Sequence, residues 1–246
     1  MTPNSGLDLA PARVARITGG LYVVYIVANV LATMLGQIGM GGAPEVYQAI
    51  VTNQGSFRLA LTLALVTGLL FVLVAWGLYV LLRPVNRSLA LLFLVLNAVG
   101  VAIAGASLIW LMPALLQGDA GSGMQTFSAG QLEGVAYLSI NVYKLGFVTS
   151  QLFLGAWLFP LGYLVYRSGL LPRFLGVLLI LDGIAEMIWF LQALLLPDYP
   201  AVHTPGLIVS FVAEVGLALW LLVMGVKPVA SGAGTGAHVP APLAPR

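Results

Sequence analysis

Long apolar stretches separated by short polar segments are the main pattern of this chain. Six stretches each hold about 20 or more mostly apolar residues, the length that a helix needs to cross ~30 Å of hydrocarbon. They are Ile17–Ile38, Phe57–Leu82, Leu89–Leu116, Lys144–Tyr166, Phe174–Leu196 and Gly206–Val226. The pattern predicts an all-α integral membrane protein, a bundle of six transmembrane helices.

The predicted membrane domain occupies residues 17–226 and leaves a short segment at each end. Residues 1–16 precede the first span, and residues 227–246 follow the last. Because the C-terminal tail is rich in Gly, Ala and Pro and has few large apolar side chains to bury, we expect it to be disordered.

Basic residues lie mostly on one side of the predicted spans. Eight of the ten Lys and Arg residues fall in the N-terminal segment, the second and fourth connections and the C-terminal end. They are Arg13, Arg16, Arg83, Arg87, Arg167, Arg173, Lys227 and Arg246. Since Lys and Arg in short loops favour the cytoplasmic side, both termini are predicted to be cytoplasmic. The protein would then be a multi-pass protein of the bacterial inner membrane, the cell membrane.

The connections on the other side are longer. Gly39–Ser56 contains Pro44 followed by Glu45, a favourable start for a helix, so a short helix is expected at the outer interface. Gln117–Gly130 is rich in glycine and predicts irregular structure. Residues 131–143 have mixed polarity, and they either lie at the interface or extend the fourth span.

Composition agrees with a membrane domain and narrows the chemistry. The chain is 60% hydrophobic and 7% charged, whereas a soluble domain has about 25% charged residues. A net charge of +2 predicts no nucleic-acid partner, and the lipid bilayer is the expected one. The chain has no cysteine, and its histidines, His203 and His238, lie in an outer loop and the tail. We therefore expect no metal site, and no motif indicates a cofactor.

Three acidic residues inside the predicted spans are the strongest functional signal. Asp182 and Glu186 lie about 12 Å and about 18 Å into the fifth span, and Glu214 lies about 12 Å into the sixth from the opposite side. Glu186 and Glu214 can therefore meet near the middle of the bilayer. An ionised carboxylate there costs about 2.5–3.5 kcal/mol, so each acid must be protonated, paired or in contact with water.

Other polar residues could offset the energetic cost of burying these acids in two ways. In one interpretation, a polar cavity opens to the outside, with Arg58 and Lys144 at its mouth and the carboxylates at its floor. In the other, the acids are protonated and hydrogen-bonded to amide side chains, as interhelical polar groups commonly are. The candidate amides are Asn29, Asn97 and Gln151. The sequence leaves both interpretations open.

Three sequence blocks carry a resemblance to a known family. They are RITGGLY at Arg16–Tyr22, GAWLFPLGYL at Gly155–Leu164 with YRS and LPR up to Arg173, and Glu214 followed by LALWL at Leu217–Leu221. Over roughly Arg13–Lys227 the chain resembles a bacterial family of polytopic membrane proteins described as domain of unknown function 4386. The resemblance implies a six-span fold and draws attention to Glu214, Trp157 and Gly162, without giving them a role.

Three classes of function fit these observations. We favour a ligand-binding, sensing or accessory bundle with a polar intramembrane site for a small molecule or a lipid. The alternative is a small proton-coupled transporter that uses the intramembrane carboxylates, although we expect no break in the helices of the kind that carriers have near their sites. The second alternative is an enzyme that acts on a lipid, with a carboxylate as general acid.

Overall fold

The computed structural model describes residues 11–117 and 126–227, and every regular element in these ranges is a helix. The elements are α1 (Pro11–Gly36), α2 (Ala43–Thr52), α3 (Gln54–Leu82), α4 (Arg87–Leu108), η1 (Ile109–Leu111), α5 (Met112–Leu116), α6 (Ala129–Ala156), α7 (Leu158–Ser168), α8 (Arg173–Leu195), η3 (Pro200–Val202) and α9 (Thr204–Val223). The expected N-terminal segment, glycine-rich loop and disordered tail lie largely outside the described residues.

Six spans in the described residues are long and apolar enough to cross a membrane, which confirms the predicted bundle. Single helices form four of them, namely α1, α3, α8 and α9, the last preceded by η3. The third span continues from α4 through η1 into α5, and the fourth joins α6 to α7. The chain is therefore a multi-pass membrane protein.

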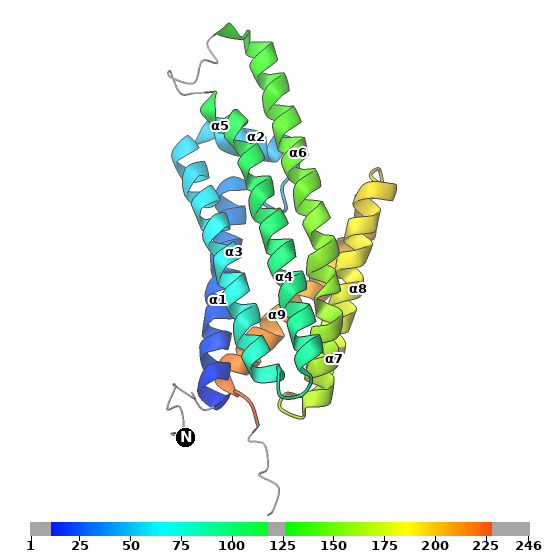
Figure 1. Cartoon of the computed structure of the whole chain (residues 1–246). Coiled ribbons are helices and arrows are strands. Elements are labelled where there is room, and N and C mark those ends of the chain that lie inside the picture. The colour runs from blue at the N-terminus through cyan, green and yellow to red at the C-terminus, as the bar shows by residue number, and fades with distance from the viewer. Residues whose placement is uncertain (1–10, 118–125, 228–246) are drawn as a thin grey trace, which may run out of the picture.

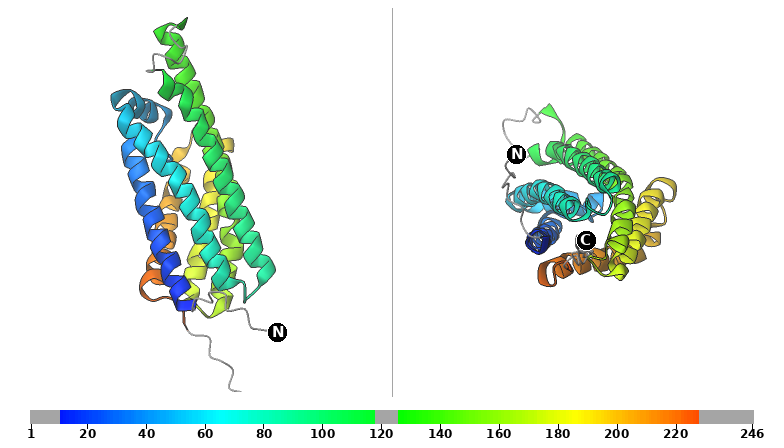
Figure 2. Two further views of the ribbon diagram at one scale, coloured as in Figure 1. Left: turned by 60° about the vertical axis from the view of Figure 1, so that its left-hand side comes forward. Right: turned by 60° about the horizontal axis from the view of Figure 1, so that its bottom comes forward.

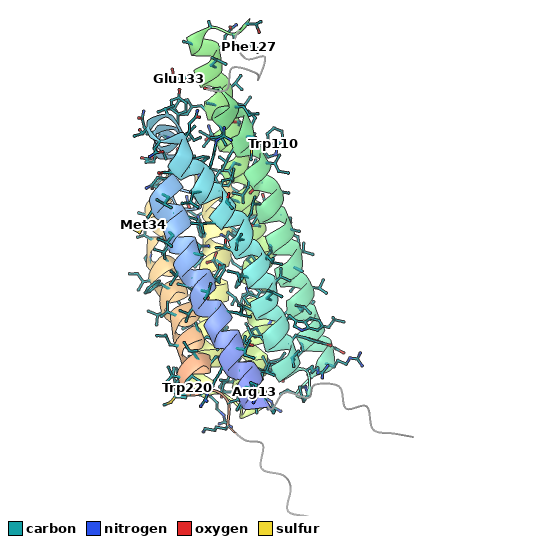
Figure 3. The ribbon with its side chains drawn as sticks, turned by 90° about the vertical axis from the view of Figure 1, so that its left-hand side faces the viewer. Arg13, Met34, Trp110, Phe127, Glu133 and Trp220 are labelled. Atoms are coloured by element: carbon teal, nitrogen blue, oxygen red, sulfur yellow. The ribbon has the colours of Figure 1, made fainter. Side chains whose placement is uncertain are left out.

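The two ends of the bundle differ in charge. The end that holds Pro11 and Lys227, here called the basal end, carries the tight α3–α4 and α7–α8 turns, and the opposite end is called the distal end (Figure 1). Figure 3 labels Arg13 at the basal end, with Phe127 and Glu133 at the distal end. Seven Lys and Arg residues and no Asp or Glu lie at the basal end of the described chain.

The six spans form a closed ring. Each span packs against its neighbours in the order α1, α3, α4, α6–α7, α8 and α9, and α9 packs back against α1 (Figure 2). The basal half of the ring is filled by a large apolar cluster in which Leu78, Phe93, Leu161 and Leu217 are fully buried. Burial of such side chains excludes water from this half of the bundle.

The distal end is closed in part by α2, the short helix predicted after Pro44. Pro44 and Glu45 occupy its first turn, and Val46 and Ile50 are buried in a second apolar cluster with residues of α3, α5 and α6. Val51, next to Ile50 on the same helix, is 52% exposed. The helix therefore packs on the bundle through one narrow face.

Residues 131–143 extend the fourth span, which resolves the alternative that the sequence left open. Ser128 caps α6: its hydroxyl accepts a 3.3 Å hydrogen bond from the Gln131 amide, and the Gln131 side chain accepts a 2.8 Å bond from the Ser128 amide. This reciprocal capping box satisfies two amides that a helix end otherwise leaves unpaired. As a result α6 rises above the other helices at the distal end (Figure 1).

The hydrogen-bond ladder of the fourth span has one break at Trp157, where α6 ends and α7 begins, although Trp157 keeps helical backbone angles (φ −66°, ψ −26°). Pro160 explains the break, because proline has no amide hydrogen to donate to the carbonyl of Ala156 four residues earlier. Hydrogen bonds resume with the Leu161 amide, which donates to the Trp157 carbonyl at 3.2 Å. The fourth span therefore remains helical through Trp157 and lacks a single hydrogen bond of its ladder.

Glycines bring the α6–α7 span very close to α8. A Cβ atom on Gly162 would lie 2.7 Å from the Gly176 carbonyl oxygen, and one on Gly183 would lie 3.1 Å from the Gly155 carbonyl oxygen. Small residues at such crossings let helix backbones approach in a membrane. The close contact fixes α8, and with it Asp182 and Glu186, against the fourth span.

Candidate functional site

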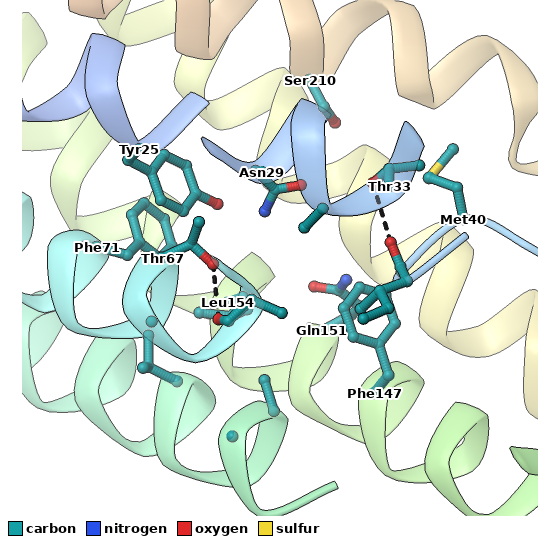
Figure 4. A pocket seen from close by; sticks show the side chains of 18 of the residues that line it. Tyr25, Asn29, Thr33, Met40, Thr67, Phe71, Phe147, Gln151, Leu154 and Ser210 are labelled. Atoms are coloured by element: carbon teal, nitrogen blue, oxygen red, sulfur yellow. Dashed lines mark hydrogen bonds between the residues drawn. The ribbon is translucent and has the colours of Figure 1, made fainter. Parts of the chain in front are cut away.

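A cavity of about 440 Å³ lies inside the ring, in the distal half of the bundle. Helices α1, α3, α4, α6, α8 and α9 all contribute to its wall. Its lining is largely apolar, with polar or ionisable side chains from Tyr25, Asn29, Thr33, Thr67, Tyr143, Gln151, Glu186, Ser210 and Glu214. Figure 4 shows several of these groups directed toward a common space.

Aromatic rings form the basal wall of the cavity. Tyr25 and Phe71 stack with ring centroids 4.5 Å apart, and the Trp157 ring meets Phe71 edge-on at 5.2 Å. Trp157 also meets Phe93, which belongs to the apolar cluster below. This aromatic layer separates the cavity from the packed basal half.

The distal wall is built from the segment that follows α1. The Tyr143 hydroxyl accepts a 2.8 Å hydrogen bond from the Gly39 amide, and the Thr33 hydroxyl donates a 2.9 Å bond to the Ile38 carbonyl. Phe147 packs beneath Gly39. These contacts hold residues 37–40 across the distal end of the cavity.

The side wall is thin. Phe211 of α9 and Leu69 of α3 line the cavity, yet they are 61% and 63% exposed, and Asn29 of α1 is also exposed. These residues reach from the cavity lining to the outer surface of the bundle, so the wall there is one side chain thick.

Two of the three predicted acids line this cavity. Glu186 of α8 and Glu214 of α9 both do, and the Ser210 hydroxyl donates a 3.3 Å hydrogen bond to Oε1 of Glu186, while Oε2 is buried without a partner. Asp182 lies one turn before Glu186 on α8, is 1% exposed and lies outside the cavity lining, and neither of its oxygens has a hydrogen-bond partner.

The three carboxyl groups are close enough to interact electrostatically with one another, and two of them, Asp182 and Glu214, also interact with Tyr22. The fully buried Tyr22 hydroxyl lies beside Glu214 but forms no hydrogen bond of normal geometry. Two ionised groups one helical turn apart, at about 6 Å, repel by about 3 kcal/mol at an effective dielectric constant of 20. An empty cavity cannot hold all three carboxylates ionised without a large energetic cost.

The predicted amides are divided between two places. Asn29 and Gln151 line the cavity with the carboxyl groups. Asn97 is fully buried outside the lining, and neither its oxygen nor its nitrogen has a hydrogen-bond partner. The hydrogen bond to the Glu186 carboxyl group comes from the Ser210 hydroxyl. The interpretation in which the acids bond to amide side chains therefore does not apply to Glu186.

The two predicted cations are not part of the cavity wall. Arg58 lies exposed in the first turns of α3 at the distal end, and Lys144 lies on α6 beside Tyr143. Lys144 is partly buried, and its neighbour Tyr143 contributes to the lining in its place. Among the lining residues that the structure describes there is no Lys or Arg.

Sequence reasoning gave too little weight to several lining residues. Tyr25 and Thr33 recur at helical spacing with the predicted Asn29 along α1 and form one polar stripe, which was a usable signal. Thr67 could not be identified in the same way, because its hydroxyl bonds locally to the Ala64 carbonyl at 2.7 Å within an apolar helix. Its place in the cavity depends on the order of helices in the ring.

Comparison with known proteins places this architecture in a family. The model described as "Domain of unknown function (DUF4386)" matches residues 17–225, which includes all six spans. The chain is also 32% identical over 159 residues to an uncharacterized protein of Archaeoglobus fulgidus, covering 65% of this chain and 79% of that protein. No solved structure matches the chain.

Proposed function

The chain belongs to the DUF4386 family, and we propose that it is a membrane protein that binds a small, largely apolar cation in the cavity between its six spans. An amine or a quaternary ammonium group attached to an apolar body would fit this description. The observation that carries the proposal is that Glu186 and Glu214 line one mostly apolar cavity to which the described residues contribute no Lys or Arg.

Electrostatics favours a cation in this cavity. A buried carboxylate without a partner is costly, and a ligand with a positive charge would supply the missing partner. Among the lining aromatic side chains, the partly buried Tyr25 would add attraction, because aromatic rings stabilise ammonium groups near their faces. The remaining apolar wall suits a ligand with a hydrophobic body that can enter from lipid.

We further infer that the distal end faces outward and that both termini are cytoplasmic in the cell membrane. The seven Lys and Arg residues at the basal end support this orientation, since basic residues near short loops are retained on the cytoplasmic side. The cavity would then be reached from the outer half of the bilayer.

A carrier for the same cation is the second candidate function. The missing hydrogen bond before Pro160 favours it, because Trp157 lies in the cavity wall at this weaker point of the fourth span. In this case the aromatic layer and the basal apolar cluster would have to separate during transport. Uptake of a labelled cation into proteoliposomes would distinguish a carrier from a binding protein.

Binding of tetraphenylphosphonium to the purified protein in lipid nanodiscs tests the main proposal. Trp157 and Trp189 line the cavity and would report occupancy through their fluorescence. Replacing both carboxylates, in Glu186→Gln/Glu214→Gln, is expected to weaken binding at least about tenfold, since it removes both counter-charges. The control Glu133→Gln changes an exposed acid at the distal end.

The proposal predicts that Glu133→Gln binds like the wild type and that neutral triphenylphosphine oxide binds much more weakly than the cation. Equal affinity of the wild type and the double variant for tetraphenylphosphonium would contradict it. So would equal affinity of the wild type for the charged and the neutral probe.

A further inference from the structure

Asp182 has a buried carboxyl group that a ligand in the cavity would not touch. It is 1% exposed, both its oxygens lack hydrogen-bond partners, and it is not part of the cavity lining. It nevertheless lies one turn from Glu186 on α8 and interacts electrostatically with both Glu186 and Glu214. A carboxyl group in this position affects the cavity through its charge or its proton.

Among the residues that the structure describes, those that face Asp182, Glu186 and Glu214 carry no positive charge. Helix α1 presents the hydroxyls of Tyr22 and Tyr25, α9 presents Glu214 and Ser210, and α8 contributes Glu186. The fourth span presents Gly155 and Gly162 to α8. At the distal end His203 stacks on Trp189 and bonds to Gln192. Protons are therefore the available positive charges when the cavity is empty.

We propose that Asp182, Glu186 and Glu214 share protons in the empty cavity and that a bound cation displaces one of them. This inference rests on the proposed function, and it adds regulation of binding by pH. The carboxyl O–H bond breaks as the cation enters, the proton passes to water or buffer, and the charge of the ligand replaces that of the proton. The total charge of the cavity stays the same.

Geometry gives the three carboxyl groups different parts in this exchange. Glu186 and Glu214 line the cavity and meet the cation. Asp182 acts as a positioning residue for the proton. Its negative charge repels that of Glu186 one turn away, so the glutamates hold a proton at a higher pH than they would without Asp182. Since Asp182 makes no contact with the ligand, its replacement should lower the affinity of the fully deprotonated cavity less than replacement of the two glutamates does, through loss of attraction at a distance alone.

The test measures tetraphenylphosphonium affinity in nanodiscs between about pH 5.5 and pH 9, together with the proton release on binding in weak buffer. This probe keeps its charge at every pH. Exchange for one proton predicts an affinity that rises about tenfold per pH unit and then reaches a plateau, with release of one proton per cation in the rising region. Asp182→Asn is expected to move the rise to lower pH, with a smaller loss of plateau affinity than Glu186→Gln/Glu214→Gln shows.

Each result has a separate meaning. Affinity that is independent of pH, without proton release, overturns the exchange even though the cation binds, whereas absence of binding at every pH overturns the proposed function instead. A pH profile of Asp182→Asn that coincides with the wild-type profile overturns the part assigned to Asp182. Asp198→Asn, which changes an exposed acid in the α8–α9 connection, should retain the wild-type profile and serves as the matched control.

Discussion

The hydroxyl of Ser210 on α9 donates a 3.3 Å hydrogen bond to Oε1 of Glu186 on α8. Glu214 follows Ser210 by one helical turn, so the same face of α9 carries both residues. The bond therefore sets the rotation of α9 that directs Glu214 into the cavity beside Glu186. Two carboxyl groups that are 28 positions apart in the sequence meet in one site.

Ser210→Ala should weaken this arrangement. The change removes the hydrogen-bond partner of a partly buried carboxyl group, which costs about 0.5–1.5 kcal/mol in folding free energy. Thermal unfolding in detergent should show a lower Tm for Ser210→Ala. Ser88→Ala, at an exposed position at the start of α4, is the control and should unfold like the wild type. An unchanged Tm for Ser210→Ala would mean that the bond contributes nothing measurable.

Gly162→Ala should separate α7 from α8. The added Cβ atom would lie 2.7 Å from the Gly176 carbonyl oxygen and 3.2 Å from the Ile180 amide nitrogen, and neither backbone atom can move without shifting the helix. Overpacking of this kind costs about 1–3 kcal/mol. Gly105→Ala on α4 meets no atom within 4 Å and should unfold at or above the wild-type Tm. Equal stability of the two variants would contradict the close crossing.

Asn97→Leu should stabilise the protein. The Asn97 amide is fully buried, and neither of its polar atoms has a hydrogen-bond partner, so the folded state bears the cost of removing them from water or lipid headgroups. Leucine has a similar shape and no polar atom. We expect a higher Tm with tetraphenylphosphonium binding unchanged, because Asn97 does not line the cavity. A lower Tm would indicate that the amide has a structural partner.

The orientation can be tested with single cysteines, since the natural chain has none. Gln48→Cys lies exposed on α2 at the distal end, and Ser88→Cys lies exposed at the basal end. A membrane-impermeant maleimide should label Gln48→Cys in intact cells and Ser88→Cys only after the membrane is opened. The reverse pattern would place the termini outside.

Hydropathy was sufficient to predict the six spans, because the length of an apolar helix is fixed by the thickness of the bilayer. The helix after Pro44 was also predictable from local start signals. The continuation of α6 through residues 131–143 was not, since a helix that leaves the membrane no longer needs an apolar surface. The break at Trp157 could have been read from Pro160.

The site was partly predictable. Ionisable residues inside spans identified Glu186 and Glu214, because their burial in lipid would have no compensation. Arg58 and Lys144 were selected as the cations near the outer ends of their spans, and that position does not by itself place a side chain in the cavity wall. Thr67 and Phe71 enter the cavity because α3 packs between α1 and α4, an order that no local pattern encodes.

Labelling with dicyclohexylcarbodiimide tests most directly whether Glu186 and Glu214 line one cavity that accepts a cation. This apolar reagent adds to protonated carboxyl groups that it can reach from lipid, and peptide mass spectrometry identifies the modified residue. We predict adducts at Glu186 or Glu214, little modification of exposed Glu133, and slower labelling when tetraphenylphosphonium is present. Adducts confined to exposed acids, or labelling at Glu186 and Glu214 that the cation does not slow, would contradict the account.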